Sequence, residues 1–107
     1  MLLKVGRHFR VSHRVKVVVG RDEAENRFLE RLRSGRWCFE VPDAGSPLVV
    51  TQGDPDADLR RLIAAIAARY SSRRGERPVQ VMASRDEESE LLQVVPASDG
   101  FLDQCRI

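Results

Sequence analysis

The sequence has few of the residues that build disulfide scaffolds, metal centres or membrane spans. Its 107 residues include two cysteines, Cys38 and Cys105, and two histidines, His8 and His13, with no Cys-x-x-Cys or other metal-ligand spacing. No apolar run reaches the roughly 18 residues of a membrane span. Residues 1–8 are too quickly charged for a secretory signal. We therefore expect a cytoplasmic protein with no metal, cofactor or membrane segment.

Side chains for acid–base or nucleophilic catalysis are also scarce. Both histidines lie in a basic N-terminal segment, and no serine or cysteine has a convincing partner pattern. Cys38 would serve as a sulfur carrier only if its thiolate lay near cations on an accessible surface. Because Cys38 alternates with Trp37 in an expected strand, an inert thiol is the better interpretation. We expect no catalytic residue, and the sulfur carrier is the weakest of the alternatives.

Acidic residues are absent before Asp22, and this absence divides the chain by charge. Residues 1–37 carry ten Lys and Arg against four acids, a net +6, whereas residues 38–107 carry eight against twelve, a net −4. A basic segment of this kind is typical of a protein that binds a polyanion. A solvated cationic edge that keeps strands from aggregating would give the same pattern.

What the sequence does contain begins with a strand that runs straight into a helix. The β-branched segment Val15–Val19 predicts a strand that ends at Gly20. Asp22 then predicts a helix N-cap with Glu25 at the capping-box spacing, and the apolar positions Ala24, Phe28, Leu29 and Leu32 predict its buried side. We expect this helix to end at Ser34-Gly35. Gly20-Arg21-Asp22 would suit a bound phosphate, but a tight turn with a carboxylate cap is the better interpretation.

The remaining chain predicts further strands and one longer helix. Asp54 predicts the helix N-cap with Pro55 at the first helical position, and Gly75 its C-terminal end. An apolar stripe at helical spacing comprises Leu59, Leu62, Ile63, Ile66 and Tyr70. Strands are expected at residues 2–5, 9–11, 36–41, 48–51, 79–83 and 91–95, whereas residues 96–107 have too little pattern. The order favours one α+β domain over residues 1–107, with a mostly antiparallel sheet and two main helices packed on one face.

Basic side chains of the N-terminal segment are the candidate binding residues. Arginine suits phosphate because its planar fork donates two hydrogen bonds. Arg27 and Arg31, four residues apart on the first helix, would extend the ridge or pair with acids of the helix. Trp37, the only tryptophan, would stack on an RNA base if partly exposed, although core packing is the stronger interpretation. The candidate RNA-binding residues are Arg7, His8, Arg10, Arg14, Lys16, Arg21, Arg27, Arg31 and Trp37.

Several blocks of the sequence resemble the NFACT RNA-binding domain (NFACT-R). Residues 19–26, Val-Gly-Arg-Asp-Glu-Ala-Glu-Asn, are similar to its Val-Gly-Arg-Asn-x-x-x-Asn unit. Residues 37–39, 44–50, 66–71 and 78–79 resemble further blocks of the family in the same order. Two family histidines fall on Phe39 and Pro47, and its motif proline falls on Ala44, so no role of those residues transfers. Residues 3–10 resemble the opening of the variant at the C-terminus of ThiI-like tRNA thiouridine synthetases.

The resemblance implies a non-catalytic module that binds RNA, in particular tRNA, and accompanies tRNA modification or thiolation. Its partner would be a ThiI-like catalytic domain in cis or in trans, because the ATP-binding catalytic domain is absent from these residues. The alternative is a protein-interaction or oligomerisation module that docks a tRNA-modifying catalytic domain. The RNA, the modification and the oligomeric state do not follow from the sequence.

Overall fold

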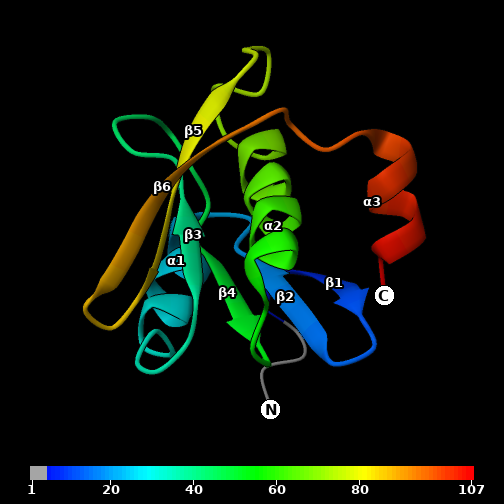
Figure 1. The fold of residues 1–107 in the computed structure, drawn as a ribbon. Coiled ribbons are helices and arrows are strands. Elements are labelled where there is room, and N and C mark those ends of the chain that lie inside the picture. The colour runs from blue at the N-terminus through cyan, green and yellow to red at the C-terminus, as the bar shows by residue number, and fades with distance from the viewer. Residues whose placement is uncertain (1–4) are drawn as a thin grey trace.

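Six antiparallel strands form one sheet with helices on both faces (Figure 1). The computed structural model describes residues 5–107, where the strand order across the sheet is β1-β2-β4-β3-β5-β6. The strands are β1 (Arg7–Ser12), β2 (Val15–Val19), β3 (Cys38–Glu40), β4 (Val49–Gln52), β5 (Val79–Arg85) and β6 (Glu88–Val94). The helices are α1 (Glu23–Glu30), α2 (Ala57–Arg69) and α3 (Asp99–Cys105). The predicted α+β class and antiparallel sheet are confirmed.

Alternating side chains divide the apolar residues between two cores. In β2, Val17 and Val19 belong to one core and Val18 to the other, as the two-residue period of a strand requires. The larger core joins α2 and α3 to one face of the sheet, with Phe9 and Phe39 fully buried. The smaller core lies on the other face and comprises Val18, Leu29, Cys38, Leu48 and Val50.

Helix α1 lies on the opposite face from α2, which differs from the expectation of two main helices on one face (Figure 1). Leu29 of α1 packs in the smaller core, whereas Ile63 of α2 packs in the larger one. The continuously apolar end of β2 supplies both faces, as strands buried on both sides do. Phe28 is 38% exposed and Ala24 is exposed, so the predicted buried side of α1 reduces to Leu29 and partly Leu32.

The predicted helix boundaries are right at the start of α1 and wrong at α2. Asp22 caps α1 by accepting from the Glu25 backbone N–H at 2.9 Å, as predicted, but α1 ends at Glu30 rather than near Gly35. Helix α2 is capped by Asp56, not Asp54: Pro55 is buried before the helix begins, and Asp54 Oδ1 lies 3.2 Å from Arg85 Nη1. Its C-cap is Tyr70, not Gly75. Leu62 of the predicted stripe is 41% exposed.

The strands differ from prediction mainly in length. The predicted strand 36–41 shortens to β3, while β5 and β6 extend toward a turn at Asp86 and Glu87. The strand predicted at residues 2–5 lies almost entirely outside the described residues. Helix α3, which the sequence pattern did not predict, has Ser98 as its N-cap and packs Phe101, Leu102 and Cys105 against the larger core.

Candidate functional site

A groove of about 500 Å³ beside the edge strand β1 is lined by basic side chains. No acidic residue contributes to its lining within residues 5–107. Arg7, Lys16, Arg21 and Arg106 supply four positive charges from four separate positions in the chain. The full lining, which we call the basic groove, is Gly6, Arg7, His8, Lys16, Arg21, Arg106 and Ile107.

The C-terminal segment completes the basic groove by pairing with β1. The Ile107 backbone N–H donates to the His8 carbonyl oxygen at 3.1 Å, and Arg106 forms a bridge with Phe9. His8 is held from the other side, because its Nε2–H donates to the Val5 carbonyl oxygen at 2.9 Å. The chain end and the first strand therefore present their side chains to the same hollow.

Tyr70, the last residue before the α2–β5 loop, holds two arginines of the basic groove. The Arg7 guanidinium carbon lies 4.9 Å from the centre of the Tyr70 ring. Arg106 donates from Nη2 to the Tyr70 hydroxyl oxygen at 3.4 Å, and its guanidinium lies 5.6 Å from the Phe9 ring centre. Contacts with aromatic rings orient a guanidinium without neutralising its charge. Both arginines therefore keep their charge for an anionic ligand.

Arg21 is oriented by a carboxylate of α1. Its Nε–H and Nη2–H donate to Glu25 Oε1 and Oε2 at 3.0 and 2.7 Å, and its backbone N–H donates to Glu25 Oε1 at 2.9 Å. The side-chain hydrogen bond from Arg21 lowers the pKa of Glu25 to about 2, and the same bond raises the pKa of Arg21. Arg21 thus enters the basic groove as a protonated guanidinium with a fixed orientation, its charge partly offset by Glu25.

A second hollow of about 350 Å³ shares Arg7 and Arg21 with the basic groove. We call it the motif pocket, because its other lining residues come from the segments that resemble the NFACT family. They are Gly20, Asp22, Glu23, Asn26, Ser46, Pro47 and Tyr70. The separated sequence blocks that carry the resemblance therefore meet at one place on the surface.

Asn26, which lines the motif pocket, links α1 to the segment that enters β4. Its Oδ1 accepts from the Leu48 backbone N–H at 3.0 Å, while the Gly20 N–H donates to the Leu48 carbonyl oxygen at 3.1 Å. A Cβ atom on Gly20 would collide with Asn26 Oδ1. Glycine at this position therefore leaves room for the asparagine side chain to reach Leu48, the residue directly before β4.

The structure separates the predicted RNA-binding residues into two groups. Arg7, His8, Lys16 and Arg21 come together in the basic groove, and Arg10 faces Lys16 across the β1–β2 pair. Arg10 itself is not part of the groove lining, and the other three charged candidates also lie outside the groove. Arg14 is exposed in the β1–β2 turn, Arg27 lies 3.4 Å from Glu23 on α1, and Arg31 is the exposed C-cap of α1.

Trp37 is a core residue rather than the partly exposed ring that base stacking requires. Only 5% of its surface is exposed, and it belongs to the larger core. The Arg60 and Arg85 guanidinium carbons lie 4.6 and 5.1 Å from its ring centre. Packing and two cations occupy its surroundings, so the ring is not open to stack on an RNA base.

Arg106 is the groove residue that the sequence interpretation missed. It follows α3, in the tail for which no element was predicted. The signal was present: Ser98 precedes Phe101, Leu102 and Cys105 at helical spacing, the pattern of a capped helix with one apolar side. Predicting that helix would have placed Arg106 at its C-terminal end, but would not have revealed that Arg106 lies beside β1.

Other kinds of site find little support in the described residues. Cys38 is 1% exposed, and burial raises the pKa of its thiol to about 11, which disfavours a sulfur carrier. Over residues 5–107, no three His, Cys, Asp or Glu side chains group as metal ligands would. In the same range, no helix is both long enough and apolar enough to cross a membrane.

Comparison with known proteins places this geometry in a family. The family model described as "NFACT protein RNA binding domain" matches residues 6–105. The fold is similar to "The structure of the C-terminal of the fibronectin/fibrinogen-binding protein from Streptococcus suis (FBPS)", with a TM-score of 0.80 and 19% sequence identity. That match covers 96% of this chain and 49% of the solved chain, so the present sequence spans about half of it. No curated protein sequence matches significantly.

Proposed function

Because this chain belongs to the family of NFACT RNA-binding domains, we propose that it is a non-catalytic module that holds the phosphates of a structured RNA, in particular a tRNA, in the basic groove. The observation that carries the proposal is the convergence of Arg7, Lys16, Arg21 and Arg106 on one hollow whose described lining has no acid. Phosphate contacts fix the position of an RNA without selecting its sequence. Recognition by shape and backbone is typical of proteins that bind folded RNA.

The chemistry of the groove favours phosphate over other anions of a macromolecule. Three of its four cations are arginines, whose planar forks match phosphate oxygens in pairs. Tyr70 orients the guanidinium groups of Arg7 and Arg106, and Glu25 orients that of Arg21. Side chains oriented before binding lose less conformational entropy when the ligand arrives.

We further propose that the module accompanies tRNA modification. The resemblance of residues 3–10 to the opening of the ThiI-associated variant supports a thiouridine synthetase catalytic domain as the partner, in cis or in trans. Such a domain would carry the chemistry, and this module would position the tRNA. Co-purification of the synthetase core with the module on a shared tRNA is the expected result.

A salt titration of tRNA binding tests the groove directly. The fluorescence anisotropy of a labelled tRNA reports the affinity of the wild-type chain and of a Lys16→Glu/Arg106→Glu variant. The logarithm of the affinity falls linearly with the logarithm of salt, by about 0.7–0.9 per phosphate contact. We expect the variant to lose about tenfold or more in affinity at low salt and to show a shallower slope.

Arg27→Glu/Arg31→Glu is the matched control, because it changes the net charge equally but lies outside the groove. This second variant is expected to bind nearly as well as the wild type. An equal loss in both variants would show that overall charge, not the groove, drives binding. If the wild-type chain binds no RNA at low salt, the proposed function is wrong.

The alternative, a module that docks a catalytic protein domain, has one structural observation in its favour. Leu91 of β6 is 49% exposed and the neighbouring Val95 is 52% exposed, at the opposite edge of the sheet from β1. A pull-down with the synthetase core in the presence of nuclease separates the two functions. Retention after nuclease treatment, lost in a Leu91→Ser/Val95→Ser variant, would favour direct protein docking.

A further inference from the structure

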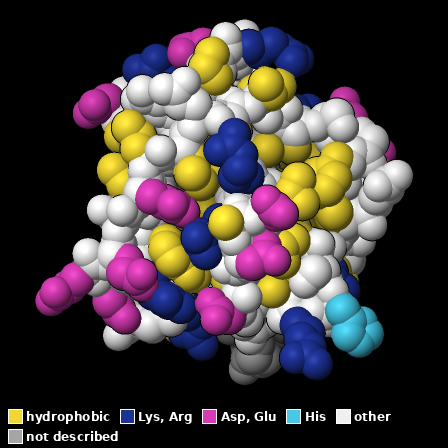
Figure 2. Space-filling model, in the orientation of Figure 1, with side chains coloured by type: hydrophobic (Ala, Val, Ile, Leu, Met, Phe, Trp, Pro, Cys, Tyr) yellow, Lys and Arg dark blue, Asp and Glu magenta, His cyan; other side chains and the backbone are white. Residues whose placement is uncertain are grey.

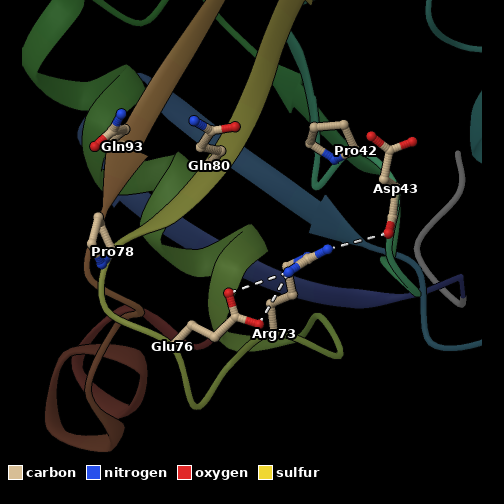
Figure 3. A pocket seen from close by; sticks show the side chains of 7 residues that line it. All are labelled: Pro42, Asp43, Arg73, Glu76, Pro78, Gln80 and Gln93. Atoms are coloured by element: carbon tan, nitrogen blue, oxygen red, sulfur yellow. Dashed lines mark hydrogen bonds and ion pairs between the residues drawn. The ribbon is translucent and has the colours of Figure 1, made fainter.

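A third hollow, of about 350 Å³, opens between the β3–β4 loop, the α2–β5 loop and the β5–β6 pair (Figure 3). Its volume lies in the range of small-ligand sites. We call it the glutamine pocket, after the two amides that reach it from neighbouring strands. Its lining is Pro42, Asp43, Arg73, Glu76, Pro78, Gln80 and Gln93.

Gln80 and Gln93 give this pocket unused hydrogen-bonding groups. They are direct cross-strand partners in the β5–β6 register, so their side chains project from the same face of the sheet. Both are exposed, and neither side-chain amide has a hydrogen-bond partner within residues 5–107. Each carboxamide offers two N–H donors and an acceptor oxygen. Side by side, they present the donor and acceptor pattern that reads the edge of a nucleobase.

The rest of the lining is suited to a neutral, flat ligand rather than to a phosphate. Pro42 and Pro78 supply apolar surfaces from opposite sides of the hollow (Figure 3). Arg73 crosses one rim, but Glu76 Oε2 lies 3.1 Å from its Nη1, and its Nη2 donates to the Asp43 carbonyl oxygen at 3.5 Å. The charge of Arg73 is therefore largely offset, and with Asp43 and Glu76 the lining holds two carboxylates against one guanidinium, which disfavours an anionic ligand.

The glutamine pocket and the motif pocket share the β3–β4 loop. The β3–β4 loop contributes Pro42 and Asp43 to the glutamine pocket and Ser46 and Pro47 to the motif pocket. Between these two sets, the Ser72 backbone N–H donates to the Gly45 carbonyl oxygen at 2.7 Å. The three hollows therefore follow one another around the same end of the molecule.

The loop that borders the pocket is basic, although it lies in the acidic part of the sequence. Arg74 and Arg77 are exposed, and neither forms an ion pair with an acid in the described part of the chain. They lie on the loop that begins directly after Tyr70 and that contributes Arg73, Glu76 and Pro78 to the pocket lining. An RNA strand that leaves the basic groove past Tyr70 would pass the mixed charges of the motif pocket and then meet Arg74 and Arg77 on this loop.

We propose that the glutamine pocket binds an unpaired nucleobase of an RNA whose phosphates lie in the basic groove. The inference rests on the proposed function and adds a base-binding subsite to it. The base would form hydrogen bonds with the carboxamides of Gln80 and Gln93 and pack against Pro42 and Pro78. The module would thus prefer a folded RNA with a single-stranded extension over a fully paired RNA.

Three RNA probes separate base recognition from phosphate binding. They are a blunt hairpin, the same hairpin with a short adenosine extension at its 3′ end, and the hairpin with an extension of abasic nucleotides. The abasic extension keeps the phosphates and removes the bases. For the wild-type chain we expect the adenosine extension to bind about tenfold more tightly than the abasic one. A Gln80→Ala/Gln93→Ala variant should lose this preference while binding the blunt hairpin normally.

Gln104→Ala is the control variant, because Gln104 is an exposed glutamine outside the pocket lining. In NMR spectra, the side-chain amides of Gln80 and Gln93 should shift with the adenosine extension and not with the abasic one. Equal binding of both extensions, or a double variant that weakens every probe alike, would overturn the base subsite while leaving the groove in place. Failure of all probes to bind the wild-type chain would overturn both proposals.

Discussion

At the scale of single residues, Cys38 shows how burial decides the chemistry of a thiol. It lies in the smaller core with 1% of its surface exposed, and burial raises its thiol pKa to about 11. Because the thiolate is the reactive form, each pKa unit lowers the reactive fraction about tenfold. We expect a Cys105→Ser variant to react with a thiol reagent at pH 8 more than tenfold slower when folded than in urea. Equal rates would show that Cys38 is accessible.

Glu25 is the residue whose titration links stability to pH. Its folded pKa of about 2 lies below the ordinary value of 4.5, chiefly because of the Arg21 hydrogen bond. A lowered folded pKa stabilises the domain above the ordinary value, and this contribution disappears as the pH falls from about 4.5 to about 2. A Glu25→Gln variant should therefore unfold at a lower temperature than the wild type near neutral pH. Thermal unfolding followed by circular dichroism should show the gap closing toward pH 2, and a constant gap would contradict this origin.

At the scale of elements, the junction of β2, α1 and β4 depends on the contact between Asn26 and Leu48. An Asn26→Ala variant leaves the Leu48 N–H without its partner at a mostly buried site. We expect a loss of about 1–3 kcal/mol in the free energy of unfolding, measured by urea denaturation. Gly20→Ala should cost a similar amount, because the new Cβ displaces the same side chain.

A double-mutant cycle identifies the cause of both losses. When Asn26 is already alanine, the Gly20→Ala change removes nothing further, so the two costs should be clearly non-additive. Gly75→Ala is the control, since a Cβ at Gly75 would meet no atom within 4 Å. It should leave the stability unchanged or raise it slightly. Additive costs at Gly20 and Asn26 would exclude the shared contact.

The elements whose signals are local could be predicted from the sequence. Asp22 with Glu25 marks the start of α1, and the β-branched run before Gly20 marks β2. The start of α2 could not be placed, because Asp54 and Asp56 are equally good caps in the sequence, and the tertiary contacts of Pro55 and of Asp54 with Arg85 distinguish them. The face that α1 covers also depends on tertiary packing, since β2 is apolar on both sides.

At the scale of the whole molecule, the fold redistributes the charge that the sequence divides into halves. Acidic side chains gather over the β5–β6 hairpin in Figure 2, at the far edge of the sheet from the basic groove. Basic side chains appear at the end of the molecule where Figure 1 places the α2–β5 loop. That loop carries Arg73, Arg74 and Arg77, so the basic surface is not confined to the first 37 residues.

The candidate site was predictable only in part, because the fold brings together residues that are distant in the sequence. Arg7, His8, Lys16 and Arg21 could be chosen from local charge, and the structure does bring them together. Arg106 could not be assigned, because its place beside β1 depends on a pairing across almost the entire chain. Gln80 and Gln93 are ordinary strand residues in the sequence and become neighbours only through the β5–β6 register.

The strand order makes the formation of the motif pocket depend on pairings between distant segments. The β1–β2 and β5–β6 hairpins close over short loops, whereas the β2–β4 and β3–β5 pairings join segments that are distant in the sequence. Pairings of high contact order form slowly, because the entropy cost of closing the long loop comes before the contacts that offset it. The motif pocket is drawn from β1, the β2–α1 junction, the β3–β4 loop and the end of α2, so its lining assembles only when the long-range β2–β4 pairing has formed. A peptide comprising residues 1–37 would keep the positive charge but would lack Tyr70 and Arg106, and with them the basic groove and the motif pocket.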